Sequence, residues 1–247
     1  MPNQLKLISV EVRGRAAVGE VRGSTHDFYE DRYRMLTMEA PLVQKADRGE
    51  VFAVIDGVGG APKGMRAAET VADALIEFFE KSERWKVCPT EFETLLRETS
   101  RKIREWGLIE GTDRSLGAAV GTIAWRIDGD VLLFHAGDTE ARILSAGTVR
   151  SVLPAEETGG AVIQYFGRGK DFALAKAEIA FGEADQLLLY TDGLRKCLQL
   201  GTIDAILKSG HSKEGIVLRL LEDAVRTGNA IDDVTAMVID LKEDYDD

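Results

Sequence analysis

The stretch GAAVGTIAWRIDGDVLLFHAGDTEARIL, residues 117–144, decides the fold class of this chain. It holds two apolar, strand-like runs separated by Asp128-Gly129, a dipeptide that favours a two-residue hairpin turn. ARILSA, Gly147 and TVRSVL predict a second hairpin immediately afterwards, over residues 141–153. Consecutive hairpins pair their strands antiparallel, so this part of the chain predicts an antiparallel sheet.

The flanking sequence adds further strands and amphipathic helices. Strands are predicted at LKLISVEVRG, RYRMLTMEA and VFAVID before the hairpins, and at AVIQYFG, QLLLYTD and VTAMVIDL after them. Apolar residues at helical spacing predict helices after Gly60, at about 90–106, 202–209 and 213–227, whereas 173–180 is ambiguous. We therefore expect an α+β fold in which two packed antiparallel β-sheets are flanked by pairs of α-helices. We expect one domain over 1–247, with its core at about 5–241 and an acidic tail at 242–247.

The composition limits the classes of partner. The chain has 247 residues, 45% of them hydrophobic, and a net charge of −11, which disfavours nucleic acid and anionic membranes. Neither a signal peptide nor a transmembrane segment is predicted. Cys88 and Cys197 are the only cysteines and form no CxxC motif, which argues against a zinc site. We expect a cytoplasmic protein with reduced thiols.

Four aspartates stand where a predicted strand meets a turn: Asp56, Asp138, Asp192 and Asp232. In an antiparallel sheet the end of one strand lies beside the start of the next, so all four can share one rim, together with Glu30 and Asp31. Several desolvated carboxylates are unfavourable together unless a cation neutralises them. The pattern predicts an oxygen-only site for two or more Mg²⁺ or Mn²⁺ ions, and metal-assisted hydrolysis as its chemistry.

Simpler interpretations compete with each motif alone. An isolated Asp-Gly is more often a turn than a metal ligand. The glycine-rich segment DGVGGAPKG, residues 56–64, could suggest a phosphate loop, but it lacks the GxxxxGK[ST] spacing of that motif. The hypothesis of a metal site depends on the joint occurrence of the aspartates in one order.

That order resembles a known family. Six segments between about Gly23 and Leu241 resemble the motifs of the metal-dependent Ser/Thr protein phosphatases of type 2C (PPM). They are EDRY, VFAVIDGVGG followed by a helix, GAAVGTIA, HAGDTEARIL, QLLLYTDGL and DDVTAMVI. The resemblance implies a β-sandwich flanked by helix pairs and a binuclear Mn²⁺ or Mg²⁺ centre. It also implies hydrolysis of phosphoserine and phosphothreonine by a metal-activated water, with a phosphorylated protein as the substrate.

The resemblance assigns roles to residues at the matching positions. Asp56 matches the aspartate that bridges both metals, and Gly57 would offer its carbonyl to one of them. Asp192 and Asp232 match the ligands of the first metal, which makes Asp56, Asp192 and Asp232 the catalytic centre.

The remaining assignments concern the second and third metals. Glu30 matches the residue near the second metal, and Asp31 is the adjacent family aspartate. Asp138, together with the aspartate of TDG, would hold a third metal.

The chain departs from the family pattern at several positions. His26 stands where the family has a phosphate-binding arginine, so Arg22 and His26 are the candidate substrate-binding residues. Val58 replaces a histidine that can act as general acid, and Asp233 replaces an asparagine. His26, Val58 and a short segment at 154–167 favour an alternative function, a pseudophosphatase that binds phosphoproteins without catalysis. An unrelated β-sandwich with structural Ca²⁺ is a third hypothesis.

Overall fold

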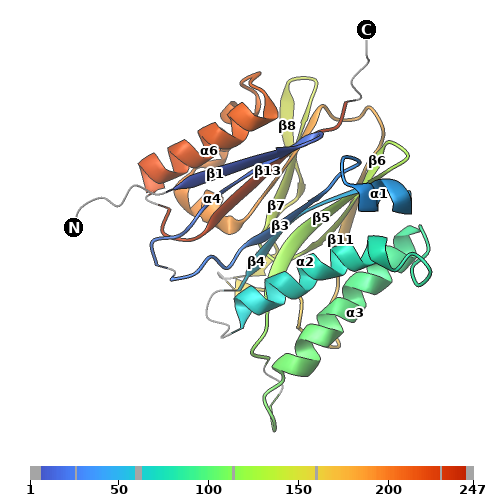
Figure 1. The fold of residues 1–247 in the computed structure, drawn as a ribbon. Coiled ribbons are helices and arrows are strands. Elements are labelled where there is room, and N and C mark those ends of the chain that lie inside the picture. The colour runs from blue at the N-terminus through green and yellow to red at the C-terminus, as the bar shows by residue number, and fades with distance from the viewer. Residues whose placement is uncertain are drawn as a thin grey trace.

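Two antiparallel sheets form the centre of the computed structural model, which describes residues 7–25, 27–58, 63–112, 115–158, 161–228 and 230–242 (Figure 1). The first sheet has the order β1 (Ile8–Arg13), β2 (Ala16–Val21), β13 (Val234–Asp240), β12 (Gln186–Tyr190), β7 (Glu140–Ser145) and β8 (Thr148–Leu153). The second has the order β11 (Ala175–Ile179), β6 (Asp130–Ala136), β5 (Ala119–Ile127), β4 (Glu50–Gly57) and β3 (Arg32–Leu36). β9 (Glu157–Thr158) and β10 (Ala161–Val162) form a separate short pair.

Helices cover the outer face of each sheet. α2 (Gly64–Glu80) and α3 (Pro89–Gly107) pack on the five-stranded sheet, where Trp125 of β5 lies among the buried rings of the helices. α4 (Asp192–Cys197), α5 (Leu200–Leu207) and α6 (Lys213–Gly228) pack on the six-stranded sheet. A third apolar cluster, which includes Phe52 and Met237, fills the space between the sheets. The predicted α+β class with two packed sheets and flanking helix pairs is confirmed.

The hairpin predicted around Asp128-Gly129, over residues 117–137, forms β5 and β6. Ile127 pairs with Asp130, and Asp128 and Gly129 both adopt positive φ, of 51° and 91°. Positive φ at both central positions matches the right-handed twist of the two strands, which explains the choice of these residues.

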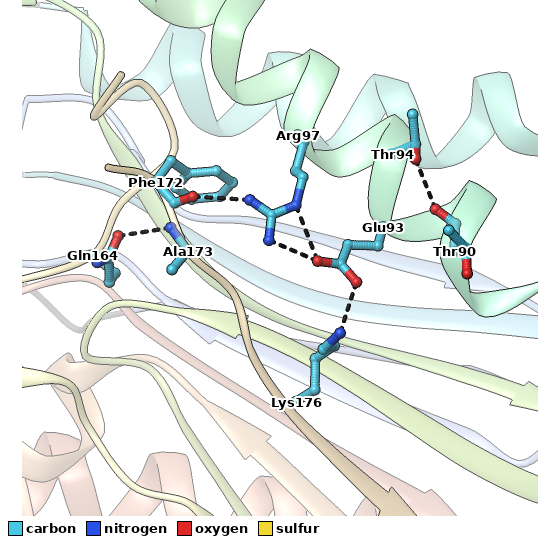
Figure 2. Close-up of polar contacts among 8 residues, drawn as sticks. All are labelled: Thr90, Glu93, Thr94, Arg97, Gln164, Phe172, Ala173 and Lys176. Atoms are coloured by element: carbon cyan, nitrogen blue, oxygen red, sulfur yellow. Dashed lines mark hydrogen bonds and ion pairs between the residues drawn. The ribbon is translucent and has the colours of Figure 1, made fainter. Parts of the chain in front are cut away.

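Figure 2 shows how α3 is tied to the segment before β11. Arg97 donates to the carbonyl oxygen of Phe172 at 2.9 Å and also binds Glu93. Lys176 of β11 reaches the other carboxylate oxygen of Glu93 at 2.8 Å. This cluster links the helix to the edge strand and contains none of the predicted site residues.

Several elements differ from the prediction. The weak strand predicted at 161–167 is wrong over most of its length, because only Ala161–Val162 forms a strand. The ambiguous segment 173–180 contains strand β11. Strand β2 and the short helices α1 (Pro41–Ala46) and α4 are not predicted by the sequence. Among the described helices, none has the length and apolar character needed to span a membrane.

Candidate metal centre

The strand pairing brings three of the candidate aspartates to one edge of the six-stranded sheet. Tyr190, the last residue of β12, pairs with Ala236 of β13 on one side and with Glu140 of β7 on the other. Asp192 follows the end of β12, while Asp232 and Asp138 precede the starts of β13 and β7. Because the three strands are antiparallel neighbours, these ends lie at the same rim.

Asp56 reaches the same rim from the other sheet. It is the penultimate residue of β4 and pairs with Val120 of β5. Gly137, beside Asp138, adopts a φ of +106°, and a Cβ atom there would lie 2.2 Å from Cγ1 of Val120. The loop that carries Asp138 is therefore packed against the strand next to Asp56, and only glycine allows this approach.

The charges of the aspartates act on one another. Burial is the largest cause that raises the pKa of Asp56 well above its ordinary value of 3.8, although part of the residue reaches solvent. The negative charges of Asp31, Asp192, Asp138 and Asp232 raise this pKa further, in that order. Each of these carboxylates is thus near enough to disfavour ionisation of Asp56, which is the electrostatic property expected of a cation site.

Asp31 is the most buried carboxylate of the group. It is 1% exposed, and the hydroxyls of Thr191 and Thr235 donate to its Oδ2 at 3.0 and 2.6 Å. Burial raises the pKa of Asp31 to about 8, the two hydroxyls oppose this shift, and the charges of Asp233 and Asp232 add to it. Asp31, which directly precedes β3, is thus linked to Thr191 after β12 and to Thr235 of β13, and it lies beneath the rim rather than on it.

Asp233 holds the segment before β3 in place. Its two carboxylate oxygens accept from the backbone N–H groups of Gly23 at 2.6 Å and of Glu30 at 2.7 Å. A Cβ atom at Gly23 would lie 2.5 Å from the carbonyl carbon of Asp232, so the two segments touch through their backbones. Asp233 therefore positions Glu30 relative to Asp232.

We expect Asp233→Ala to be less stable than Asp233→Asn by about 1–3 kcal/mol, the scale for leaving buried polar groups without a partner. Both variants remove the charge, but asparagine keeps an acceptor oxygen for one of the two N–H groups. Urea unfolding of both in EDTA measures the difference. Equal stabilities would show that the two hydrogen bonds do not hold this segment.

The other predicted residues have varied surroundings. Glu30 is partly exposed, and Arg22 is exposed and donates to the carbonyl oxygen of Asp27 at 3.1 Å. A Cβ atom at Gly57 would lie 2.6 Å from the carbonyl carbon of Gly64, so this glycine is required by the close start of α2. His26 lies outside the described residues. The ligand and substrate-binding roles of all four stay predictions.

Lys196 is the functional candidate that the sequence analysis missed. Its Nζ lies 2.6 Å from Oδ2 of Asp192 and 2.5 Å from Oδ2 of Asp232. Burial lowers the pKa of Lys196, but the hydrogen bonds to both aspartates outweigh this, and the pKa lies above its ordinary value. The spacing of four residues between Asp192 and Lys196 is the signal that could have indicated the first ion pair.

The residue types fit a site for hard divalent cations. The carboxylates that act on Asp56 supply only oxygen ligands, which Mg²⁺ and Mn²⁺ prefer, and a cation would relieve their mutual repulsion. Within the described part of the chain, however, no three Asp, Glu, His or Cys side chains are arranged so that they could already hold a metal ion. The rim therefore gathers suitable ligands without presenting a formed coordination sphere.

Comparison with known proteins agrees with this fold. The family model described as Protein phosphatase 2C matches residues 30–215. The chain therefore belongs to the protein phosphatase 2C family of protein serine/threonine phosphatases. The search of curated proteins finds no match.

Solved structures similar to this chain come from bacterial phosphatases. The serine/threonine phosphatase Stp1 from Staphylococcus aureus has 16% identity and a TM-score of 0.77, over 94% of this chain and 96% of that chain. PstP/Ppp of Mycobacterium tuberculosis has 21% identity and a TM-score of 0.72, over 93% and 99%. The catalytic domain of PstP in complex with two manganese ions has 19% identity and a TM-score of 0.72, over 95% and 99%. At these identities the likeness shows the fold.

Proposed function

We propose that this chain is a Mn²⁺- or Mg²⁺-dependent phosphatase that removes phosphate from phosphoserine and phosphothreonine in protein substrates. The observation that carries the proposal is the convergence on Asp56 of the charges of Asp31, Asp138, Asp192 and Asp232. Family membership and the two manganese ions of the PstP structure support it.

The residues of the rim would divide the ligand positions as the family pattern implies. Asp56 would serve both main positions and the carbonyl of Gly57 one of them. Asp192 and Asp232 would serve the first position, and Glu30 the second. Asp138 with Asp192 would serve a third. When bound, divalent ions neutralise the phosphate and acidify the attacking water.

The chain itself explains why cations are needed. A phosphate dianion brought to a rim of several carboxylates is repelled by each of them, and the net charge of −11 adds to this repulsion. Arg22 is the described basic side chain proposed for the phosphate, and His26, four residues later in the sequence, is the other candidate. We propose no nucleic-acid or membrane partner, and the cytoplasmic location stays a prediction.

The test measures hydrolysis of p-nitrophenyl phosphate and of a phosphothreonine peptide in EDTA, Mn²⁺ and Mg²⁺. We expect turnover of both substrates only with a divalent ion. Absence of turnover with either ion in both assays would contradict the proposal.

A second candidate function is a pseudophosphatase that binds phosphoproteins. It is favoured by Lys196, which already engages two of the proposed ligands, Asp192 and Asp232, and by Val58 in place of a histidine. Binding of a phosphothreonine peptide in EDTA, without turnover when Mn²⁺ is added, would support this candidate over the first.

A further inference from the structure

Lys196 is held over the first proposed metal position by the geometry of α4. The helix begins at Asp192, and Lys196 follows one turn later. Side chains on a helix lean towards its N-terminus, so a residue four positions on covers the turn before it. The ammonium of Lys196 is thereby directed back onto the carboxylate of Asp192.

The second partner of Lys196 comes from a distant part of the chain. Asp232 precedes β13, and α4 lies directly against this segment, because a Cβ atom at Gly193 would be only 1.8 Å from the carbonyl oxygen of Asp233. Glycine at 193 permits this approach. It brings Oδ2 of Asp232 within 2.5 Å of the Lys196 Nζ, so one ammonium joins both carboxylates.

The exposed fractions of the three side chains indicate on which side of the aspartates Lys196 lies. The side chain of Lys196 is 52% exposed, whereas those of Asp192 and Asp232 are 21% and 25% exposed. The ammonium therefore lies on the solvent side of two more deeply placed carboxylates. A divalent ion that bound both aspartates would meet the positive charge of this ammonium, which already contacts Oδ2 of each carboxylate.

We propose that Lys196 is a built-in cation that competes with the divalent ion for Asp192 and Asp232. This inference rests on the proposed function, since it assumes that the two aspartates are metal ligands. In the metal-free protein the ammonium neutralises part of the acidic rim. Metal enters the first position only when the lysine moves out towards solvent, so the lysine weakens the apparent affinity for the ion.

The expected change in Mn²⁺ affinity follows from the fraction of molecules in which Lys196 has moved away from the two aspartates. Apparent affinity falls by the fraction of molecules in which the ligands are available. If the lysine engages both aspartates in about nine molecules of ten, its removal should tighten metal binding about tenfold.

The experiment measures Mn²⁺ binding to the metal-free protein, residues 1–247, by titration calorimetry. It compares wild type with Lys196→Gln, Lys196→Arg and Lys213→Gln. Lys196→Gln should bind the first Mn²⁺ about tenfold more tightly, and Lys196→Arg should stay near wild type because it keeps the charge. Lys213→Gln is the matched control, since Lys213 pairs with Asp240 at 3.1 Å outside the rim. Lys196→Met serves as a second neutral variant should Lys196→Gln fail to fold.

Melting in EDTA gives a readout independent of activity. Lys196→Gln should melt at a lower temperature than wild type without metal and gain more from added Mn²⁺, because the ion replaces the lost cation. A merely structural lysine would lower the melting temperature without changing Mn²⁺ affinity.

The outcomes separate the two hypotheses. Equal Mn²⁺ affinity in wild type and Lys196→Gln, or weaker binding by the variant, would overturn the role of Lys196 and leave the proposed function standing. If neither wild type nor Lys196→Gln binds Mn²⁺, both the role of Lys196 and the proposed function would be overturned.

Discussion

Asp56→Asn should lower kcat by at least about 10²-fold while making the metal-free protein more stable. The loss of activity follows because Asp56 is the proposed ligand of both main metal positions, and removal of one preorganised electrostatic group from an active site has an effect on this scale. The Mn²⁺-dependent rate with a phosphothreonine peptide measures it.

The gain in stability follows from the sign of the pKa shift. Burial and four neighbouring carboxylates raise the pKa of Asp56 in the folded protein above its ordinary value of 3.8. The favourable contribution of Asp56 to the free energy of unfolding is therefore complete only below pH 3.8 and is lost as the pH rises. Asparagine keeps the shape of the side chain without the charge, so the melting temperature in EDTA at neutral pH should rise.

Added Mn²⁺ should reverse the order of the two proteins. Wild type should gain stability from the ion by mass action, by about 2.7 kcal/mol at a hundredfold excess over Kd, and Asp56→Asn should gain much less. Asp73→Asn is the control, because Asp73 lies on α2, 64% exposed and paired with Arg34. Activity of Asp56→Asn within a few-fold of wild type would contradict the proposed centre.

The second large effect concerns Asp31 and pH. The folded-state pKa of Asp31 is about 8, against an ordinary value of 3.8. The protonated carboxyl thus contributes stability that is present in full below pH 3.8 and is lost as the pH rises through about 8. One pKa unit corresponds to about 1.4 kcal/mol, so the loss over this window amounts to several kcal/mol.

Asp31→Asn should flatten the pH dependence of stability. The amide oxygen can still accept from the hydroxyls of Thr191 and Thr235, and the residue no longer ionises. Urea unfolding in EDTA between pH 4.5 and 8 should show a slope shallower than that of wild type by up to about 1.4 kcal/mol per pH unit. Asp73→Asn should keep the wild-type slope, and an unchanged slope in Asp31→Asn would refute a buried, proton-binding Asp31.

Much of the fold could be predicted from local patterns. Asp128-Gly129 and its flanking strands predict the central hairpin, because turn chemistry and strand pattern agree there. The long helices α2, α3 and α6 are predicted because their apolar stripes run over many turns. Strand β2 was missed, since AAVGEV is small and buried at nearly every position and shows no alternation. Helix α4 was missed because Asp192-Gly193 is typical of a turn.

The features of the candidate site can likewise be separated into those that the sequence predicts and those that depend on the tertiary structure. By itself, the sequence determined which carboxylates stand at strand ends and that the candidate ligands are oxygens, because both depend on residue type and local order. The tertiary structure alone decided that Asp31 is buried under two threonine hydroxyls and that Lys196 joins Asp192 to Asp232. Burial and ion pairing arise where segments distant in the chain pack together, here α4 against the residues before β13, and no local pattern records that contact.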